Sequence, residues 1–183
     1  GKWIAIAVVV VILIAAMSGG EDNPKKVETA DAESSETTTE SATDTSEDRE
    51  EKDTFGIGET AEMNNVQVTM VSYSENEGSE YNKPTDGNEY VMVEFDIVNN
   101  SENEITVSSA LSFDGYADDY ALNYSFAAMM ENETSNQLDG TIAPGKKMDG
   151  MVGFEVPKDW KTMEIHFKDD VWSNSKFKFE IEK

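Results

Sequence analysis

The stretch from Glu89 to Asn100, EYVMVEFDIVNN, places an apolar side chain at every second position. The alternating residues are Val91, Val93, Phe95 and Ile97, and the positions between them hold Tyr90, Met92, Glu94, Asp96 and Val98. A period of two is typical of a β-strand that buries one face and leaves the other face to water. The stretch therefore predicts a half-buried strand in the middle of a β-rich domain.

Shorter alternating runs recur from residue 55 to the end of the chain. Their apolar positions are Val66, Val68, Met70, Val71, Tyr73, Ile105, Val107, Leu111, Phe113, Tyr120, Leu122, Tyr124, Phe126, Met148, Val152, Phe154, Val156, Met163, Ile165, Phe167, Phe177, Phe179 and Ile181. No long segment has the 3.6-residue period of crossover helices, so we expect antiparallel sheets with one apolar face each. Residues 54–183 are predicted to form an all-β sandwich of seven or eight strands, with a barrel as the alternative.

Two short motifs predict turns between these strands. Asp114-Gly115 is a frequent hairpin dipeptide. In Ile142-Ala-Pro-Gly-Lys, Pro144 presets its own φ and Gly145 can take the positive φ that the second turn position requires. We expect the chain to reverse direction at both places.

A purely apolar segment opens the chain. Residues 3–17 read WIAIAVVVVILIAAM, which as a helix would span about 22 Å. Lys2 precedes the segment and Glu21-Asp22 follow it, so the positive-inside rule places the rest of the chain on the outer side of a membrane. We expect residues 1–20 to be an uncleaved transmembrane anchor; a signal segment cut near Ser18 is the alternative.

Residues 21–53 form an acidic tract rich in serine and threonine. The tract carries 13 acidic residues against four basic ones, and its apolar residues are Val27 and three alanines. Such a segment buries too little surface to offset the loss of chain entropy on folding. It is predicted to be a disordered linker that holds the domain away from the membrane.

The charge of the chain restricts its partners. The net charge is −24, and residues 54–183 alone carry 25 acidic residues against nine basic ones. Such a domain repels phosphate backbones, so we expect no nucleic-acid binding. High negative charge favours basic partners or cations instead.

Nothing in the sequence indicates catalysis, and we expect the protein not to be an enzyme. Cysteine is absent, which removes thiol nucleophiles and thiolate metal sites. His166, the only histidine, alternates with Met163, Ile165 and Phe167 and is expected at the surface rather than as a general base. No nucleophile elbow, P-loop or His-Glu-x-x-His motif is present. We therefore assign no catalytic, cofactor-binding or metal-binding residues.

Two weaker signals concern ligands. The acids Asp114, Asp118 and Asp119 could offer oxygen ligands to calcium, although their spacing does not match an EF-hand and solvated turn acids are the simpler interpretation. Tyr116, Tyr120, Trp160 and Trp172 lie in or beside loops, and Met129-Met130 could cap the same end of the core. They could anchor a partner, but the favoured interpretation is that they plug the ends of the core.

The order of three segments resembles a known family. They are EYVMVEFDIVNNSENEITVSS, then SFDG, then IAPGKKMDGMVGFEVPKD. This pattern resembles Gram-positive surface lipoproteins whose domain has no assigned activity and is similar to the immunoglobulin-like sandwich of a mycobacterial immunoprotective secreted antigen. Met17 stands where such a lipoprotein would carry its lipidated cysteine. The resemblance implies an immunoglobulin-like domain on the envelope and supplies no catalytic residues.

The sequence thus predicts an immunoglobulin-like β-sandwich held outside a Gram-positive cell membrane by its N-terminal segment. Its expected role is binding or envelope assembly without catalysis, with a protein or a cell-wall polymer as ligand and no cofactor. The alternative function is a calcium-stabilised adhesion domain.

Overall fold

A computed structural model describes residues 24–27, 54–132, 136–169 and 175–183. These residues form two main antiparallel sheets and a small third one. The five-stranded sheet has the order β1 (Lys25–Val27), β2 (Thr60–Met63), β3 (Val66–Asn76), β4 (Asn88–Asn99) and β9 (Lys146–Pro157). The four-stranded sheet has the order β11 (Phe177–Glu182), β10 (Thr162–Phe167), β6 (Phe113–Ala117) and β7 (Tyr120–Leu122). A ribbon of β5 (Ile105–Val107) and β8 (Gly140–Ile142) and one short helix, α1 (Phe126–Met130), complete the described part.

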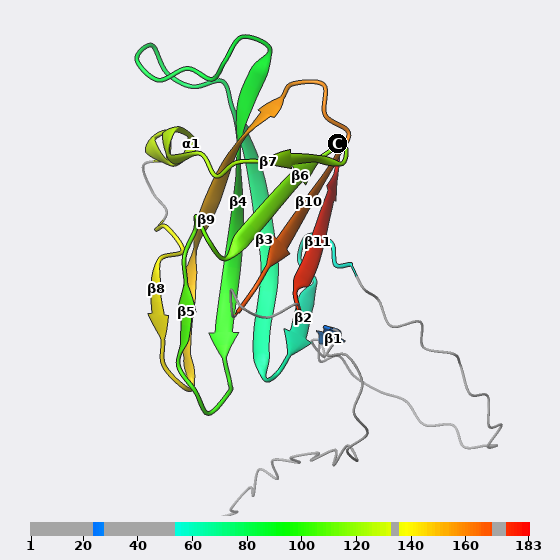
Figure 1. The fold of residues 1–183 in the computed structure, drawn as a ribbon, viewed down its shortest axis with the longest axis vertical. Coiled ribbons are helices and arrows are strands. Elements are labelled where there is room, and N and C mark those ends of the chain that lie inside the picture. Colours follow the sequence, from blue (N-terminus) through cyan, green and yellow to red (C-terminus); the bar gives the residue numbers. More distant parts are fainter. Residues whose placement is uncertain (1–23, 28–53, 133–135, 170–174) are drawn as a thin grey trace, which may run out of the picture.

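Most strands run roughly along the long axis of the molecule, whereas β7 runs across it (Figure 1). The inner faces of the two main sheets share one apolar core. Its residues come from the whole length of the domain sequence, from Phe55 to Ile181. The prediction of an all-β antiparallel sandwich is confirmed, with more strands than the seven or eight expected. Within the described residues, no helix has the length and apolar character that a membrane crossing requires.

Strand β4 lies between β3 and β9 and is paired over nearly its whole length on both sides. Its alternating residues Val91, Val93, Phe95 and Ile97 are all completely buried. The alternation therefore predicted the core face of this strand correctly. Because every backbone group of a central strand can pair with a neighbouring strand, β4 is the central, doubly hydrogen-bonded strand of the larger sheet.

The outer face of β4 differs from the expectation in its first half. Tyr90 and Met92 were predicted to face water, but their exposed fractions are 1% and 5%. They pack with Ala128 of α1 in a second, smaller apolar cluster, against which Met151 also lies. The prediction was wrong here because α1 covers this part of the sheet, and a helix of five residues leaves little periodic signal.

The predicted turn at Asp114-Gly115 is also wrong. Both residues lie inside β6, and the chain reverses at Asp118-Asp119, where φ is 46° and 68°. Aspartate tolerates this left-handed conformation, which two-residue hairpin turns require. Gly115 serves packing instead, because a Cβ atom there would lie 2.6 Å from Cε1 of the buried Phe154 ring.

The predicted Pro144-Gly145 turn is confirmed. It belongs to a set of hydrogen bonds around Asn99 that connects the loops at the lower end of the sandwich in Figure 1. Gly145 has a φ of 71°, and its N–H donates to the carbonyl of Asn99 over 2.7 Å. The buried Asn99 amide donates to the carbonyls of Asn103 (2.7 Å) and Ile142 (2.8 Å). Its side-chain oxygen accepts from the backbone N–H of Ser101 over 3.0 Å. The end of β4 is thereby tied to β8 and to the loop before β5.

The N-terminal part of the chain contributes one strand. Residues 21–53 were predicted to be a linker without structure, yet Lys25–Val27 within them forms β1 and pairs with β2. An open sheet edge presents unpaired backbone groups, and these can order a short segment that has no apolar face of its own. The predicted anchor at residues 1–20 and the remainder of the linker, apart from Pro24, lie outside the described residues.

Gly115→Ala should destabilise the domain by about 1–3 kcal/mol, because the added methyl group would displace a ring in a close-packed core. Urea denaturation of the full chain measures the effect. Gly56→Ala is the matched control, since a Cβ atom there would meet only a carboxylate oxygen at 3.7 Å. Equal stability of the two variants would contradict the packing role of Gly115.

Candidate functional site

Two of the three acids considered for calcium are used in other ways, and the third, Asp119, lies exposed in the turn after β6. The Asp118 carboxylate accepts from the backbone N–H groups of Thr162 (2.9 Å) and Lys161 (3.0 Å), and these bonds lower the pKa of Asp118. Asp114 forms an ion pair of 2.6 Å with Lys168. Four residues of extended chain place the two acids about 13 Å apart. Among the residues described, no group of three His, Asp or Glu side chains could hold a metal ion. The structure therefore does not form the calcium site considered from the sequence.

His166 was expected at the surface, and this was wrong. The residue lies on the outer face of the four-stranded sheet but is only 6% exposed, with the Tyr116 ring 5.1 Å from its own ring. Nε2 lies 3.1 Å from a Glu164 oxygen, and the Lys176 ammonium donates to Nδ1 over 3.0 Å. Burial lowers the pKa of His166, partly opposed by the hydrogen bond to Glu164. Since both ring nitrogens have structural contacts, His166 is better explained as a packed polar residue than as a general base.

Trp160, which lies between β9 and β10, plugs the core, as the favoured interpretation predicted. Its side chain is completely buried and meets the Tyr73 ring edge-on at 6.1 Å. The indole N–H donates to Glu89 over 3.0 Å, and the Lys183 ammonium donates to the same oxygen over 2.7 Å. The cation also lies 5.0 Å from the centre of the Trp160 ring. The arrangement is a satisfied polar cluster that stabilises this part of the fold.

The other aromatic and methionine candidates differ in how far they are buried. Tyr116 packs on His166, whereas Tyr120 in β7 is 78% exposed. Of the methionine pair, Met129 is buried and Met130 is 64% exposed. Trp172 lies outside the described residues.

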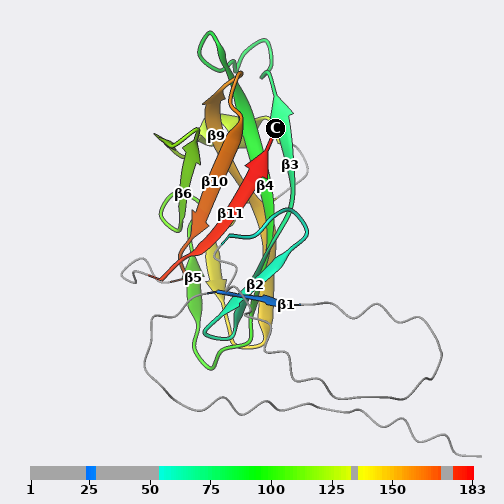
Figure 2. The same ribbon diagram turned by 90° about the vertical axis from the view of Figure 1, so that its right-hand side faces the viewer.

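The loop between β3 and β4 and the helix α1 together form what we call the tip surface, made of residues 77–87 and 126–130. Both elements lie near the upper end of the molecule in Figures 1 and 2, with the helix below the loop. The tip surface presents three largely exposed apolar side chains: Tyr81 at 93%, Phe126 at 61% and Met130 at 64%. Met130 was already a candidate from the sequence. Phe126 was predicted to continue the alternating run that starts at Tyr120, which is wrong because it begins α1. Tyr81 was missed, because a single apolar residue in a polar loop carries no periodic signal.

Asn82 connects the two halves of the tip surface. Its amide N–H groups donate to the carbonyl of Ala127 (2.8 Å) and to the carboxylate of Glu131 (2.7 Å). Its side-chain oxygen accepts from the buried Tyr90 hydroxyl over 3.2 Å. The loop and the helix are therefore held in one arrangement by side-chain contacts and not only by the chain itself.

The base of the loop is attached to β9. The Glu155 carboxylate accepts from the backbone N–H of Thr85 and from the Asn88 amide, each over 2.9 Å. These bonds lower the pKa of Glu155. Lys158, which follows β9, forms an ion pair of 2.6 Å with Glu77 at the other side of the loop. Attachment on both sides limits how far the loop can move relative to the larger sheet.

Helix α1 packs closely on β9, at a position where the strand has a glycine. The Ser125 hydroxyl caps the helix by accepting from the N–H of Ala128 over 3.1 Å. A Cβ atom on Gly153 would lie 2.9 Å from the Cβ of Ala128, so glycine is needed in β9 beneath the helix. Because the helix turns Ala128 and Met129 toward the sheet, its two other large apolar residues, Phe126 and Met130, face solvent.

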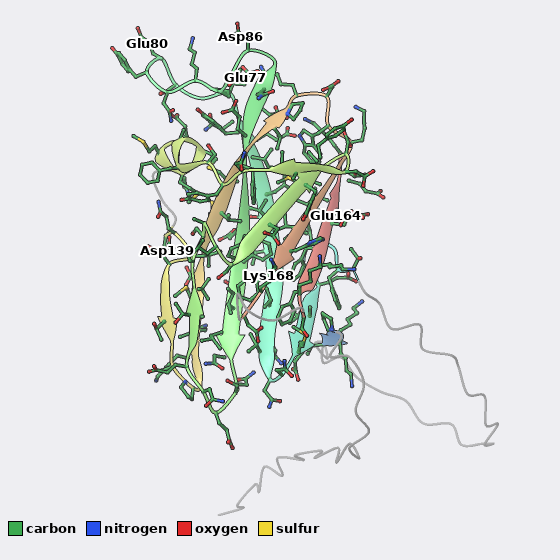
Figure 3. The ribbon with its side chains drawn as sticks, viewed as in Figure 1. Glu77, Glu80, Asp86, Asp139, Glu164 and Lys168 are labelled. Atoms are coloured by element: carbon green, nitrogen blue, oxygen red, sulfur yellow. The ribbon has the colours of Figure 1, made fainter. Side chains whose placement is uncertain are left out.

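The tip surface is acidic as well as apolar. Residues 77–87 contain Glu77, Glu80 and Asp86 against a single base, Lys83. Figure 3 shows Glu80 and Asp86 at the outer part of the loop, away from the sheets. Apolar side chains beside carboxylates suit a ligand that is both apolar and cationic.

A second candidate site is an open groove at the lower end of the molecule. It encloses about 570 Å³ between the β2–β3 turn, β5 and the segment that follows β10. Its lining combines the apolar Val66, Ile105 and Leu111 with small polar side chains and two carboxylates, Glu104 and Asp169. No histidine, lysine or arginine lies among the described lining residues, so the groove is acidic.

Comparison with known proteins places the fold. A family described as a domain of unknown function, DUF4352, matches residues 55–177. YcdA of Bacillus subtilis, described as a candidate lipoprotein, is 20% identical with a TM-score of 0.55, and the match covers 65% of this chain and 37% of that chain. The YjhA protein of Bacillus subtilis is 16% identical with a TM-score of 0.54, over 70% of this chain and 99% of that chain. This chain thus spans little more than a third of YcdA, and no curated protein matches it.

Asn82→Ala should destabilise the domain by about 1–3 kcal/mol, because it leaves the buried Tyr90 hydroxyl and the Ala127 carbonyl without a partner. Chemical denaturation combined with hydrogen exchange of residues 77–87 measures the effect. Asn123→Ala, at an exposed position, is the control. Unchanged stability and unchanged exchange in the loop would show that Asn82 does not hold the tip surface together.

His166 should make stability depend on pH. Burial keeps the pKa of His166 below the unfolded value of about 6.5, so the unfolded chain takes up a proton first as the pH falls. The free energy of unfolding should therefore decrease from pH 7.5 to 5.5, by at most about 1.4 kcal/mol per pH unit from this group. In His166→Gln this contribution is absent, so the difference in stability between the parent and the variant should shrink toward low pH. A difference that stays constant or grows would contradict the assignment.

Proposed function

The chain belongs to the DUF4352 family, and from this premise we propose that it is a non-catalytic binding module, attached to the cell membrane and facing outward, whose tip surface binds a partner. The resemblance to Gram-positive lipoprotein domains drawn from the sequence motifs is confirmed. The observation that carries the proposal is that the tip surface presents three exposed apolar side chains on two elements that Asn82 joins.

Attachment to the membrane is supported by the sequence before β1. Residues 3–17 are apolar throughout, and acidic residues follow them. The structural neighbour YcdA is described as a candidate lipoprotein, which supports a membrane-attached address. Met17 stands where a lipoprotein would carry its modified cysteine, so we propose that the apolar segment itself is the anchor.

The position of the tip surface fits this orientation. Strand β1, the described segment nearest to the apolar residues in sequence, lies at the lower end in Figures 1 and 2, and the tip surface lies at the upper end. The two ends are joined by β4, whose 12 residues span about 37 Å. A domain tethered near β1 would therefore present the tip surface away from the membrane.

A protein partner with basic residues suits the tip surface best. Tyr81 and Phe126 can bind apolar side chains and can also receive a lysine or arginine over their rings. Glu80 and Asp86 would attract the same cations, and the net charge of −24 would speed their approach. The same charge repels nucleic acid.

Site-specific photocrosslinking in cells tests the proposal. A photoreactive phenylalanine analogue at position 81 of the full chain should yield a discrete protein adduct, and Glu80→Lys with Asp86→Lys should reduce that adduct several-fold. The control places the analogue at Tyr120, which is similarly exposed but lies on the other sheet.

Two results would contradict the proposal. Adducts of equal yield from positions 81 and 120 would show that the tip surface is not a preferred binding site. A heterogeneous adduct that a cell-wall hydrolase removes would show that the ligand is a polymer and not a protein.

A further inference from the structure

We infer that the outer edge of β2 is a docking site for the chain's own Lys25–Val27 and that this segment acts as a releasable strap. The strap is distinct from the tip surface and lies at the opposite end of the molecule. Its docking is a case of strand addition, in which an extended segment completes the open edge of a sheet.

The register places basic residues of the strap against acidic residues of the domain. Lys25 stands opposite Glu62, Lys26 opposite Ala61 and Val27 opposite Thr60. The Lys26 ammonium also forms an ion pair of 3.0 Å with Glu59. Opposite charges on facing strands stabilise one register over its alternatives.

The Glu59 carboxylate, which binds Lys26 of the strap, is held in position by a contact within the domain. The Glu59 oxygen that does not meet Lys26 accepts from the backbone N–H of Gly56 over 2.8 Å. That bond lies wholly within the segment that precedes β2, so it does not depend on β1. A fixed carboxylate beside an open strand edge selects an extended segment that carries a lysine at the matching position.

The strap is also the part of its tract that best fits this edge. Residues 21–53 hold 13 acidic residues and four basic ones, and two of the four are Lys25 and Lys26. Most other three-residue pieces of the tract would bring further carboxylates toward Glu59 and Glu62. Charge complementarity therefore explains why this segment, in an otherwise acidic tract, pairs with the domain.

Few contacts hold the strap, so it can be released. It pairs over three residues, and both lysines are exposed. Residues 28–53 connect it to the domain, and a flexible chain of that length has an end-to-end distance of roughly 28 Å. Such a connection keeps the strap at a millimolar effective concentration near its own edge. Docking within one chain is then favoured over docking between chains, yet a competing segment could still displace the strap.

Docking would set how far the domain can stand from the membrane, a consequence that rests on the proposed anchor. With the strap docked, only residues 18–24 connect the apolar segment to the sheet, and they reach at most about 25 Å. With the strap released, residues 18–53 make the connection, and their limit is about 125 Å. Release would therefore extend the reach of the tip surface several-fold.

Disulfide trapping tests the strap directly, because the chain has no cysteine of its own. The variant Val27→Cys with Thr60→Cys joins facing positions of β1 and β2, whose Cα atoms should lie within the range that a disulfide spans. In the detergent-solubilised full chain, mild oxidation should form an intrachain disulfide at least about tenfold faster than in the control, Val27→Cys with Glu164→Cys. Glu164 lies on the other sheet.

Two further versions of the trapping experiment test the role of the strap's positive charge. Adding Lys26→Gln to the trapping pair should slow disulfide formation several-fold, since the ion pair with Glu59 is lost. A peptide of sequence DNPKKVET, copied from residues 22–29, should slow it at millimolar concentration, and the peptide DNPEEVET should not. Insensitivity to both changes would overturn the basic character of the site.

The remaining outcomes also decide the question. Equal rates for the trapping pair and the control would overturn docking altogether, and disulfide-linked dimers would assign the site to a second copy of the chain. Thr60→Cys removes a hydroxyl contact of 2.7 Å with Thr69. The pair Lys25→Cys with Glu62→Cys therefore repeats the trapping at a neighbouring register position. Because the assay needs neither membrane nor partner, its result is independent of the proposed binding function.

Discussion

The structure depends on the two-sided pairing of β4. This strand binds β3 along one edge and β9 along the other, and its apolar face supplies Val93 and Phe95 to the centre of the core. The Phe95 ring lies 5.3 Å from the rings of both Phe113 and Phe179, which belong to the opposite sheet. One strand therefore carries the larger sheet and also joins it to the smaller sheet. A shift of one residue in its register would turn all of these side chains out of the core.

The two ends of β4 have different roles, and buried polar side chains take part in closing each of them. At the lower end, Asn99 ties the strand to its neighbouring loops through its amide group. At the upper end, Glu89 accepts from Trp160 and Lys183, and Tyr90 reaches Asn82. The upper contacts leave a loop and a short helix fixed on a rigid sheet, an arrangement that favours recognition because little order must be gained on binding. The lower end offers a sheet edge and receives the chain's own basic segment.

Much of the fold could be predicted from the sequence because long alternating strands carry a strong signal. The core face of β4 is confirmed for that reason. The turn at Gly145, which was predicted from a local Pro-Gly motif, is also confirmed. Local motifs were less reliable: Asp114-Gly115 looks like a turn, but its glycine is needed for packing against a ring that lies far away in sequence. The candidate site was harder still. The exposure of Tyr81 and the bridge made by Asn82 arise from contacts between a loop and a helix that are 45 residues apart, and no local pattern encodes such contacts.

Native-state hydrogen exchange of the full chain tests most directly whether β4 is the element on which the rest depends. The amides of Val91 to Ile97 should exchange only through global unfolding, with one common free energy, whereas amides of residues 77–87 should exchange through smaller local openings. If the β4 amides exchange as fast as those of the loop, or before those of the four-stranded sheet, β4 does not have this central role.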